Sequence, residues 1–374
     1  MDQEQRTIQT AQEALNPYAV GTPKIKVLGL GGGGSNAVNR MIELGLEGVD
    51  FIAANTDHQA LASSLAPTKL QIGPRVTRGL GAGGDPRSGA AAAMESAREI
   101  AAALRGADMV FLTAGMGGGT GTGAAPVAAE IAKELGILVV AIVTMPFSFE
   151  MNRRAQNALE GVKRLQPHAN TLITVPNDRL LQIVPRELSL EVAFRLADDV
   201  LRQGVQGVSE LVTRPGLINV DFAHVRELLL HGGGALMAIG FGEGETKTTD
   251  AIEQALHHPL LQVDSLEQAS GVLVHFTGGD DLTLFEVGDA VSQLHNSMND
   301  QSDVILGAST DPSMNGRAQA IVIVTGIGGR PLPTASASAV HETMAEKAEE
   351  AIEPDLNAAD LDLPTFLRRR LQVQ

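Results

Sequence analysis

The sequence GMGGGTGTG, residues 115–123, decides the fold, because seven small residues in succession (117–123) leave the main chain almost free of side chains. It follows the apolar run MVFLTA (109–114) and precedes the Ala-rich segment 124–135, which we expect to be a helix with Pro126 in its first turn. In such a strand–turn–helix unit, successive main-chain N–H groups point inward and bind an anion. The hydroxyls of Thr120 and Thr122 are expected as additional donors.

A second glycine loop, GLGGGGSN at residues 29–36, follows the strand candidate IKVLGL (25–30). Its Gly29, Gly31 and Gly34 satisfy G-x-G-x-x-G, which by itself leaves open a dinucleotide site with Asp57 as the ribose-binding acid, or a tight turn without a ligand. A dinucleotide fold has no use for two such loops, whereas a triphosphate bound from several sides does. The P-loop pattern G-x-x-x-x-G-K-[ST] does not occur, so a P-loop nucleotidase is excluded.

Strand and helix patterns alternate around these loops. Further strand candidates are DFIAAN (50–55), ILVVAIVT (137–144) and TLITVP (171–176), with a helical stretch at 153–166. This alternation predicts a parallel sheet with helices on both faces. A long helix follows at 189–212, and a second, smaller α/β domain is expected after it, with strands at 235–240, 271–277, 303–308 and 320–326.

Composition sets the broad class. The chain has 374 residues, 44% hydrophobic and 19% charged, which indicates a folded protein of two domains with tails. A net charge of −16 argues against nucleic-acid binding and against non-specific binding to anionic membranes. The chain has no cysteine, and we expect neither a signal peptide nor a membrane span, which fits a cytoplasmic protein.

The two glycine loops, GLGGGGSNAVNRM and GGGTGTGAAP, resemble the tubulin/FtsZ family, most closely its bacterial cell-division members. Other segments match that family in order: NTD (55–57), GLGAGGDP (79–86), PFSFEMNRR (146–154), VPNDRLL (175–181), RPGLINVDFAHVR (214–226) and DLDLPTFLRRR (360–370). The resemblance covers residues 24–328 and the tail.

The resemblance implies a Rossmann-like, parallel-sheet GTP-binding domain that a long central helix joins to a smaller α/β domain. The expected boundaries are 1–22 for a flexible extension, 23–188 for the GTP-binding domain, 189–212 for the central helix, 213–329 for a GTPase-activating domain, 330–359 for a disordered linker and 360–374 for a partner-binding peptide.

The resemblance also assigns GTP-binding residues. The phosphates are expected to contact the two glycine loops and Ala82 to Gly84, Glu150 and Arg154 to lie at the ribose and phosphates, Phe194 to pack on the base, and Asp198 to accept from guanine N1–H and N2–H. The whole predicted GTP site comprises Gly31, Gly32, Gly33, Gly34, Ser35, Asn36, Asn55, Asp57, Ala82, Gly83, Gly84, Gly115, Gly117, Gly118, Gly119, Thr120, Gly121, Thr122, Glu150, Arg154, Asn177, Phe194 and Asp198. Mg²⁺ is expected with GTP, and K⁺ is a candidate second cation.

The resemblance further implies that a loop of the next subunit completes the site for GTP hydrolysis. Here Asn219 would contact the phosphate or the attacking water, and Asp221 would orient that water. Asp221 is also a good N-cap for the helix that begins there. The family usually has a second carboxylate where this chain has His224, so we expect slower hydrolysis that depends on pH between roughly 6 and 8.

The tail resembles a peptide that binds membrane-anchoring and regulatory division proteins. Its partner-binding residues are expected to be Asp362, Leu363, Pro364, Phe366, Leu367 and Arg368. Self-assembly into head-to-tail filaments at the midcell division ring is the expected function. The alternatives are a filament-forming relative with little hydrolysis, for which His224 is the support, and a nicotinamide-dependent dehydrogenase, which leaves GGGTGTG unexplained.

Overall fold

The computed structural model describes residues 23–182, 189–213, 217–218, 220–230, 233–261, 269–295, 298 and 302–326. The predictions for the extension 1–22, for the linker and tail 330–374, and for Asn219 lie outside these residues. All of the described residues belong to one compact unit, 1–329.

Ten strands of the described part of the chain form one sheet in the order β3-β2-β1-β4-β5-β6-β7-β10-β8-β9. They are β1 (Ile25–Leu30), β2 (Val49–Asn55), β3 (Thr68–Gln71), β4 (Met109–Gly115), β5 (Leu138–Met145), β6 (Thr171–Pro176), β7 (Gly233–Glu243), β8 (Gly271–Gly278), β9 (Asp303–Thr310) and β10 (Arg317–Thr325). The strands from β3 to β7 pair in parallel, as predicted for β1, β2, β4, β5 and β6; β3 was not predicted, and β7 was expected in a second domain. Beyond β7 the sheet is mixed, because β10 runs antiparallel to both β7 and β8.

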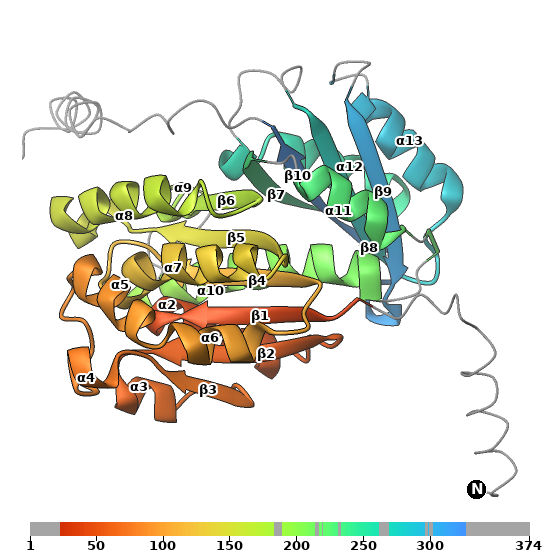
Figure 1. Cartoon of the computed structure of the whole chain (residues 1–374). Coiled ribbons are helices and arrows are strands. Elements are labelled where there is room, and N and C mark those ends of the chain that lie inside the picture. Colours follow the sequence, from red (N-terminus) through yellow and green to blue (C-terminus); the bar gives the residue numbers. More distant parts are fainter. Residues whose placement is uncertain are drawn as a thin grey trace, which may run out of the picture. The chain divides into compact units, whose positions relative to one another are not determined.

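Helices cover both faces of the parallel strands (Figure 1). On one face α2 (Gly31–Glu43) and α10 (Leu190–Thr213) share a core with side chains such as Val27, Val38 and Val205. On the other face lie α5 (Pro86–Glu95), α6 (Ala97–Leu104), α7 (Thr120–Glu134) and α8 (Asn152–Leu165). Alternate residues of β1 therefore enter different cores, which is why its sequence is apolar apart from Lys26.

The C-terminal strands carry helices of their own. These are α11 (Phe222–Leu230), α12 (Lys247–Leu256) and α13 (Leu284–His295), and the short helices α3 (His58–Ala62), α4 (Pro74–Thr77) and α9 (Asn177–Leu180) lie earlier in the chain. The core under α12 and α13 contains Phe276 and Val322. The first core extends from β1 through α10 to Ile321 on β10, so the two halves of the chain share one apolar interior.

The long helix α10 spans Leu190–Thr213, so each end lies one residue later than in the predicted range 189–212. Its Leu201, Val205 and Val208 are buried against the sheet. The structure corrects one detail of the glycine helix: α7 begins at Thr120, so Pro126 lies in its second turn and not in its first. Helical geometry starts within the glycine run because glycine adopts it without steric cost, and sequence patterns place helix ends only to within a few residues.

Candidate functional site

The two glycine loops meet where the strand order reverses. Strands β3, β2, β1, β4, β5 and β6 are neighbours in that order, so the loops after β1 and β4 leave the sheet side by side. They lead to opposite faces, since α2 shares its core with α10 whereas α7 packs with α5 and α8. Parallel α/β sheets form their ligand crevice at such a point, outside the carboxyl ends of the strands.

The two loops pack backbone against backbone. A Cβ atom added to Gly31 would lie 2.8 Å from the main-chain nitrogen of Gly121, and one on Gly34 would lie 2.3 Å from the carbonyl oxygen of Thr113. Gly31 also has a φ of +70°, which side-chain-bearing residues rarely adopt. In contrast, nothing lies within 4 Å of the Cβ positions of Gly32 and Gly118. The loops are therefore closed toward each other and open on the outside, as a main-chain anion site requires.

A third loop, at residues 82–85, packs against the loop after β4. A Cβ on Gly119 would approach the Ala82 Cβ to 2.8 Å and the Asp85 nitrogen to 3.0 Å. The positions of Gly83 and Gly84 are open and have φ values of +58° and +74°. Residues 82–85 thus border the loop after β4, as the predicted site requires.

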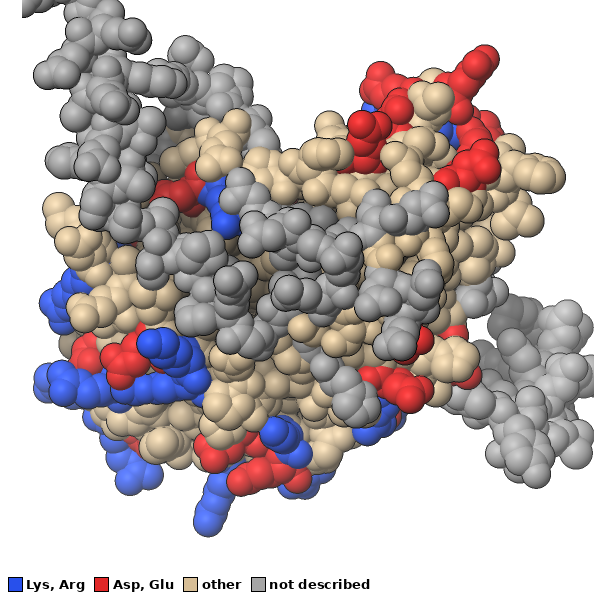
Figure 2. Space-filling view, turned by 90° about the horizontal axis from the view of Figure 1, so that it is seen from above, with Lys and Arg blue, Asp and Glu red and all other residues tan. Residues whose placement is uncertain are grey.

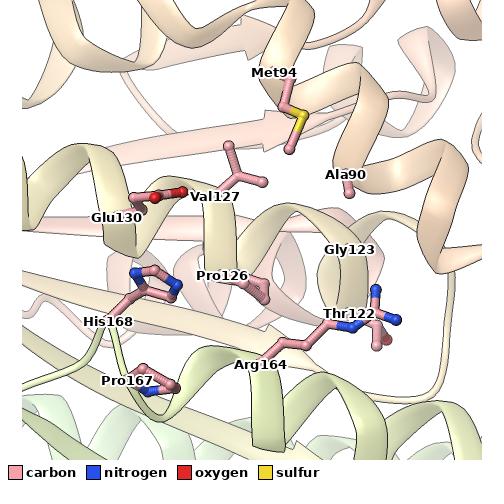
Figure 3. A pocket seen from close by; sticks show the side chains of 10 residues that line it. All are labelled: Ala90, Met94, Thr122, Gly123, Pro126, Val127, Glu130, Arg164, Pro167 and His168. Carbon is pink, nitrogen blue, oxygen red and sulfur yellow. The ribbon is translucent and has the colours of Figure 1, made fainter.

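The two threonines of the loop after β4 have different environments. Thr120 Oγ1 lies 2.6 Å from Thr56 Oγ1. Thr122 Oγ1 accepts a 2.8 Å hydrogen bond from Gly117 N–H, and its side chain is buried. Figure 3 shows Thr122 lining a separate hollow of about 380 Å³ between α5, α7 and α8. Thr122 thus stabilises the loop through its hydroxyl oxygen, in addition to the donor role expected of its O–H group.

Buried polar atoms near the carboxyl ends of the strands include some without a hydrogen-bond partner. Among them are Ser35 Oγ in the second turn of α2 and Asn177 Oδ1 in the first turn of α9, directly after β6. Buried polar atoms are rarely left unpaired in native proteins. Asn36, next to Ser35, is exposed. This pattern fits a site that binds a polar ligand.

Asn55, the last residue of β2, and Asp57, just after it, form hydrogen bonds with the neighbouring main chain. Asn55 Oδ1 accepts a 3.2 Å hydrogen bond from Asp57 N–H. Asp57 Oδ1 in turn accepts from Gln59 and Ala60 N–H at 2.8 and 3.1 Å, as the N-cap of α3. In this structure both side chains therefore support the turn beside the glycine loops.

Glu150 and Arg154 form an ion pair at the start of α8. Glu150 Oε1 also accepts a 2.9 Å hydrogen bond from Phe147 N–H. A Cβ on Gly117 would lie 2.9 Å from the Arg154 carbonyl oxygen, so this pair borders the loop after β4. Between them, Met151 has a φ of +75°. Such non-glycine backbone conformations are strained and cluster at functional sites.

Phe194 and Asp198 lie one turn apart on α10. The Phe194 ring meets the rings of Phe147 and Phe149 edge-on, with centroids 5.5 and 6.5 Å apart. Burial raises the pKa of Asp198 to about 7, against the opposing charge of Arg40 and together with repulsion from Asp199. Because burial outweighs the charge of Arg40, a ligand that brings its own hydrogen-bond donors would stabilise the ionised form of this carboxyl group.

Asp221 and His224, two of the three predicted catalytic residues, lie elsewhere. Figure 1 shows β1 and β4 ending at the left, while α11, which follows Asp221 and carries His224, lies on the right among the C-terminal elements. Asp221 Oδ1 accepts a 2.9 Å hydrogen bond from Ala223 N–H, so it is an N-cap of α11. His224 is exposed. Within one chain, the structure does not bring these two residues to the glycine loops.

Several residues at the site were missed by sequence reasoning. Asn157 on α8 lies 3.4 Å from the carbonyl oxygens of both Gly84 and Gly117 and so links two loops. Arg40 Nε on α2 lies 3.9 Å from Asp199 Oδ1 on α10. Ordinary polar residues on amphipathic helices give no local signal of such contacts, because partners distant in sequence define them.

Two searches of the described residues were negative. They contain no group of three or more His, Cys, Asp or Glu side chains arranged to hold a metal ion. None of their helices combines the length and the apolar character needed to span a bilayer.

Comparison with known proteins matches this geometry. A family model described as the GTPase domain of the tubulin/FtsZ family matches residues 24–185, and one described as the C-terminal domain of the FtsZ family matches residues 233–328. An FtsZ dimer from M. jannaschii is 42% identical, with a TM-score of 0.81, covering 88% of this chain and 94% of that chain.

More distant structures share the fold. CetZ1 from Haloferax volcanii, a GDP-bound monomer, is 21% identical with a TM-score of 0.70, covering 87% of this chain and 100% of that one. CetZ2 from the same organism, a GTPγS-bound protofilament, is 23% identical with a TM-score of 0.71, covering 87% and 99%. The glycine loops therefore open the helices of a GTPase domain and not of a dehydrogenase, and the chain belongs to the tubulin/FtsZ family.

Proposed function

We propose that this protein is a GTP-dependent polymerising GTPase that assembles head-to-tail filaments, forming the cytokinetic ring at midcell in the bacterial cytoplasm. The observation that carries the proposal is the pair of side-chain-poor loops, which meet at the carboxyl ends of β1 and β4 and stay open at Gly32 and Gly118. In a chain with a net charge of −16, main-chain N–H groups and the positive ends of α2 and α7 are suited to neutralise a triphosphate.

Each part of GTP has a matching group. The loops at 31–36, 82–84 and 115–122 would hold the phosphates, with Mg²⁺ bound to the nucleotide and K⁺ as a further candidate. Glu150 and Arg154 would contact the ribose and phosphates, and Phe194 would pack on the base. Guanine presents N1–H and N2–H side by side, and the Asp198 carboxylate accepts both. Asn177 Oδ1 and Ser35 Oγ, buried without partners, would gain hydrogen bonds from the nucleotide or its water.

Hydrolysis would take place between subunits. Asn219, Asp221 and His224 would come from the neighbouring subunit, since Asp221 and His224 lie away from the glycine loops of their own chain. Asp221 would orient the attacking water while its other hydrogen bond caps α11. The site is then complete only in a filament.

Exposed apolar side chains support contact with a second copy. Leu80 and Met151, on the loops that border the candidate nucleotide site, are 78% and 77% exposed, and Leu284 and Phe285 at the start of α13 are 74% and 87% exposed. Figure 2 shows a cluster of mainly acidic side chains at the upper right, whereas Lys and Arg side chains mixed with acidic ones lie at the left and along the lower edge. An uneven charge distribution of this kind favours contact between unlike surfaces, as in head-to-tail assembly.

The decisive test mixes two defective proteins. Asp221→Ala removes the donated carboxylate, and Asp198→Asn weakens GTP binding, so each variant by itself should hydrolyse GTP slowly. In filaments of the two variants mixed in equal amounts, some interfaces combine an intact nucleotide site with an intact loop. If the order of the subunits is random, about a quarter of the interfaces do so, and the mixture should recover about a quarter of the wild-type rate. Wild-type activity should also rise sharply above a critical concentration. A rate linear in protein at all dilutions, with no recovery on mixing, would contradict hydrolysis between subunits.

One observation favours a second candidate function. Because His224 replaces the expected second carboxylate, the protein could instead be a GTP-binding filament former with little hydrolysis. Pelleting with GTP together with negligible phosphate release would identify this alternative.

The tail 360–374 completes the proposal. It would bind membrane-anchoring and regulatory division proteins through Asp362, Leu363, Pro364, Phe366, Leu367 and Arg368. Deleting it should leave filament assembly in vitro unchanged and abolish recruitment to such partners.

A further inference from the structure

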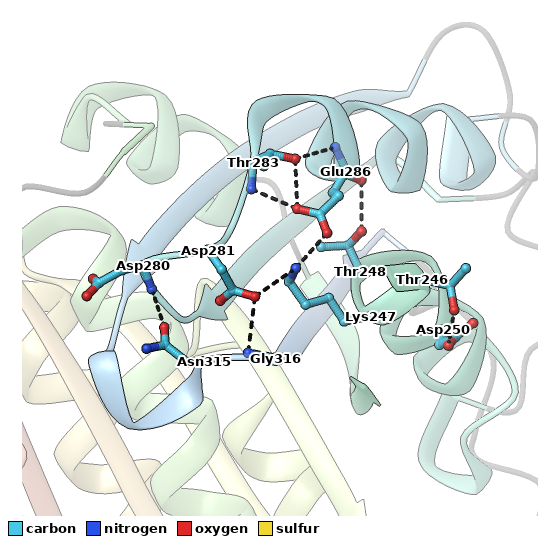
Figure 4. Close-up of polar contacts among 10 residues, drawn as sticks. All are labelled: Thr246, Lys247, Thr248, Asp250, Asp280, Asp281, Thr283, Glu286, Asn315 and Gly316. Carbon is cyan, nitrogen blue, oxygen red and sulfur yellow. Dashed lines mark hydrogen bonds and ion pairs between the residues drawn. The ribbon is translucent and has the colours of Figure 1, made fainter. Parts of the chain in front are cut away.

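A nearly buried lysine joins three segments of the C-terminal region. The Lys247 side chain, in the first turn of α12, is 5% exposed, and its Nζ lies 2.6 Å from Glu286 Oε1 and 3.2 Å from Asp281 Oδ2 (Figure 4). A buried ammonium group between two carboxylates costs desolvation and is therefore weak evidence for stability as such. Its directed hydrogen bonds, however, set the positions of the groups that it joins.

The other side-chain oxygen and the main-chain N–H of Glu286 form the N-terminal cap of α13. Its Oε2 accepts hydrogen bonds from Thr283 N–H at 2.8 Å and from Thr283 Oγ1 at 2.7 Å, while Glu286 N–H donates to Thr283 Oγ1 at 3.3 Å. This reciprocal pattern is a capping box. Thr248 Oγ1 on α12 also donates to the Glu286 carbonyl oxygen at 2.9 Å. Lys247 thereby connects the first turn of α12 to the cap of α13.

Asp281 extends the connection to the turn between β9 and β10. Its Oδ2 accepts a 3.1 Å hydrogen bond from Gly316 N–H. Next to it, Asp280 N–H donates to Asn315 Oδ1 at 2.8 Å. A Cβ on Gly279 would approach Asn315 Oδ1 to 2.2 Å, so this turn packs tightly on the loop before α13. The loop is thus held from two sides, and Lys247 pairs with Asp281 in the loop and with Glu286 in the first turn of α13.

Helix α13 begins directly after this loop with two highly exposed apolar residues. Leu284 and Phe285 are 74% and 87% exposed, so their own packing does little to position them. Their position depends on the backbone at the start of α13, which the capping box and the Lys247 ion pairs define. We propose that Lys247 is a positioning residue for self-assembly, holding Leu284 and Phe285 where the next copy of the chain contacts them. This inference rests on the proposed filament function.

The direct test replaces Lys247 by methionine, which keeps the length of the side chain and removes its charge. The critical concentration for GTP-dependent pelleting should rise about tenfold, which corresponds to the loss of one well-placed contact. GTP uptake by dilute subunits should not change, because Lys247 lies outside the glycine-loop site. Lys247→Arg should restore most of the assembly, since it supplies donors to the same carboxylates.

A matched control lies directly before the same helix. Thr246, the residue before Lys247, donates a 2.7 Å hydrogen bond from its Oγ1 to Asp250 Oδ2 of α12 itself. Thr246→Ala should leave the critical concentration unchanged. If Lys247→Met folds poorly, Asp281→Asn provides a milder break, with a rise of about threefold because a neutral amide holds the ammonium less strongly.

A double-mutant cycle separates positioning from general destabilisation. In a Leu284→Ala/Phe285→Ala background, which should itself assemble poorly, Lys247→Met should raise the critical concentration no further, although it would still lower the melting temperature. An equal further rise would overturn the inference. So would wild-type-like assembly of both Lys247→Met and Asp281→Asn, or of the Leu284→Ala/Phe285→Ala protein. Failure of the unmodified chain to pellet with GTP would instead contradict the proposed function.

Discussion

At the carboxyl ends of β1 and β4 the chain is held together by main-chain atoms, whereas at the start of α13 it is held by charged side chains. Gly31, Gly34 and Gly119 pack so closely on neighbouring backbone that no side chain fits. Around Lys247, by contrast, charged and polar side chains connect three segments through ion pairs and hydrogen bonds. An added side chain disrupts a region in which main chain packs directly on main chain. Removal of a charged group disrupts a region that ion pairs hold together.

The largest expected effect is on the backbone-built region. Gly34→Ala would place a Cβ 2.3 Å from the Thr113 carbonyl oxygen, and such overpacking should cost about 3 kcal/mol or more and abolish GTP binding. Gly32→Ala has free space and should fold normally, while weakening GTP binding by blocking close approach of phosphate. Urea unfolding and titration with labelled GTP measure both. Equal stabilities for the two variants would contradict the packing described here.

Substitution of Asp198 tests whether a side chain binds the guanine base, in contrast to the main-chain atoms that are expected to bind the phosphates. Asp198→Asn should lower GTP affinity roughly 10- to 100-fold, because one of two acceptors for guanine is lost. Affinity for xanthosine triphosphate should rise, since its O2 accepts from the new amide. Competition binding with both nucleotides gives the answer, and an unchanged preference would remove Asp198 from the base site.

Stability against pH tests the burial of the same carboxyl group. The pKa of Asp198 is raised from 3.8 to about 7, so the folded protein binds more protons than the unfolded one between these values. Its contribution to stability is therefore largest at low pH and is lost as pH rises, by up to about 2 kcal/mol between pH 5 and 7. Relative to the wild type, Asp198→Asn should become progressively more stable over this range in urea unfolding. A constant difference across it would show that Asp198 is not buried as described.

The smallest effect is expected at the donated loop. His224→Asp should raise the rate of GTP hydrolysis in filaments, by less than about tenfold, and flatten its pH dependence between roughly 6 and 8. GTP binding should stay the same, because His224 lies away from the glycine loops of its own chain. Phosphate release at several pH values measures this. Equal rates and pH profiles for the two proteins would show that His224 has no part in the chemistry.

Much of the nucleotide half was predictable because its signals are local. The strands were predicted close to their observed ends, since their side chains are buried on both faces and the runs are therefore continuous. The short edge strand β3 was missed, as its residues TKLQ carry no apolar pattern. The mixed pairing after β7 was also not predicted, because pairing direction depends on connections between segments and not on the composition of any one of them.

The amino-acid sequence by itself determined the glycine loops, the α/β alternation and the family resemblance, because steric freedom and hydrophobic periodicity act within a few residues. The tertiary structure decided that Asp198 is partly buried with a raised pKa, and that Lys247 joins α12 to the start of α13. These properties arise between segments distant in sequence, since Arg40 lies on α2 and Asp198 on α10, and 39 residues separate Lys247 from Glu286. They depend on burial and on the positions of partners, which only the packing of the whole sheet and its helices defines.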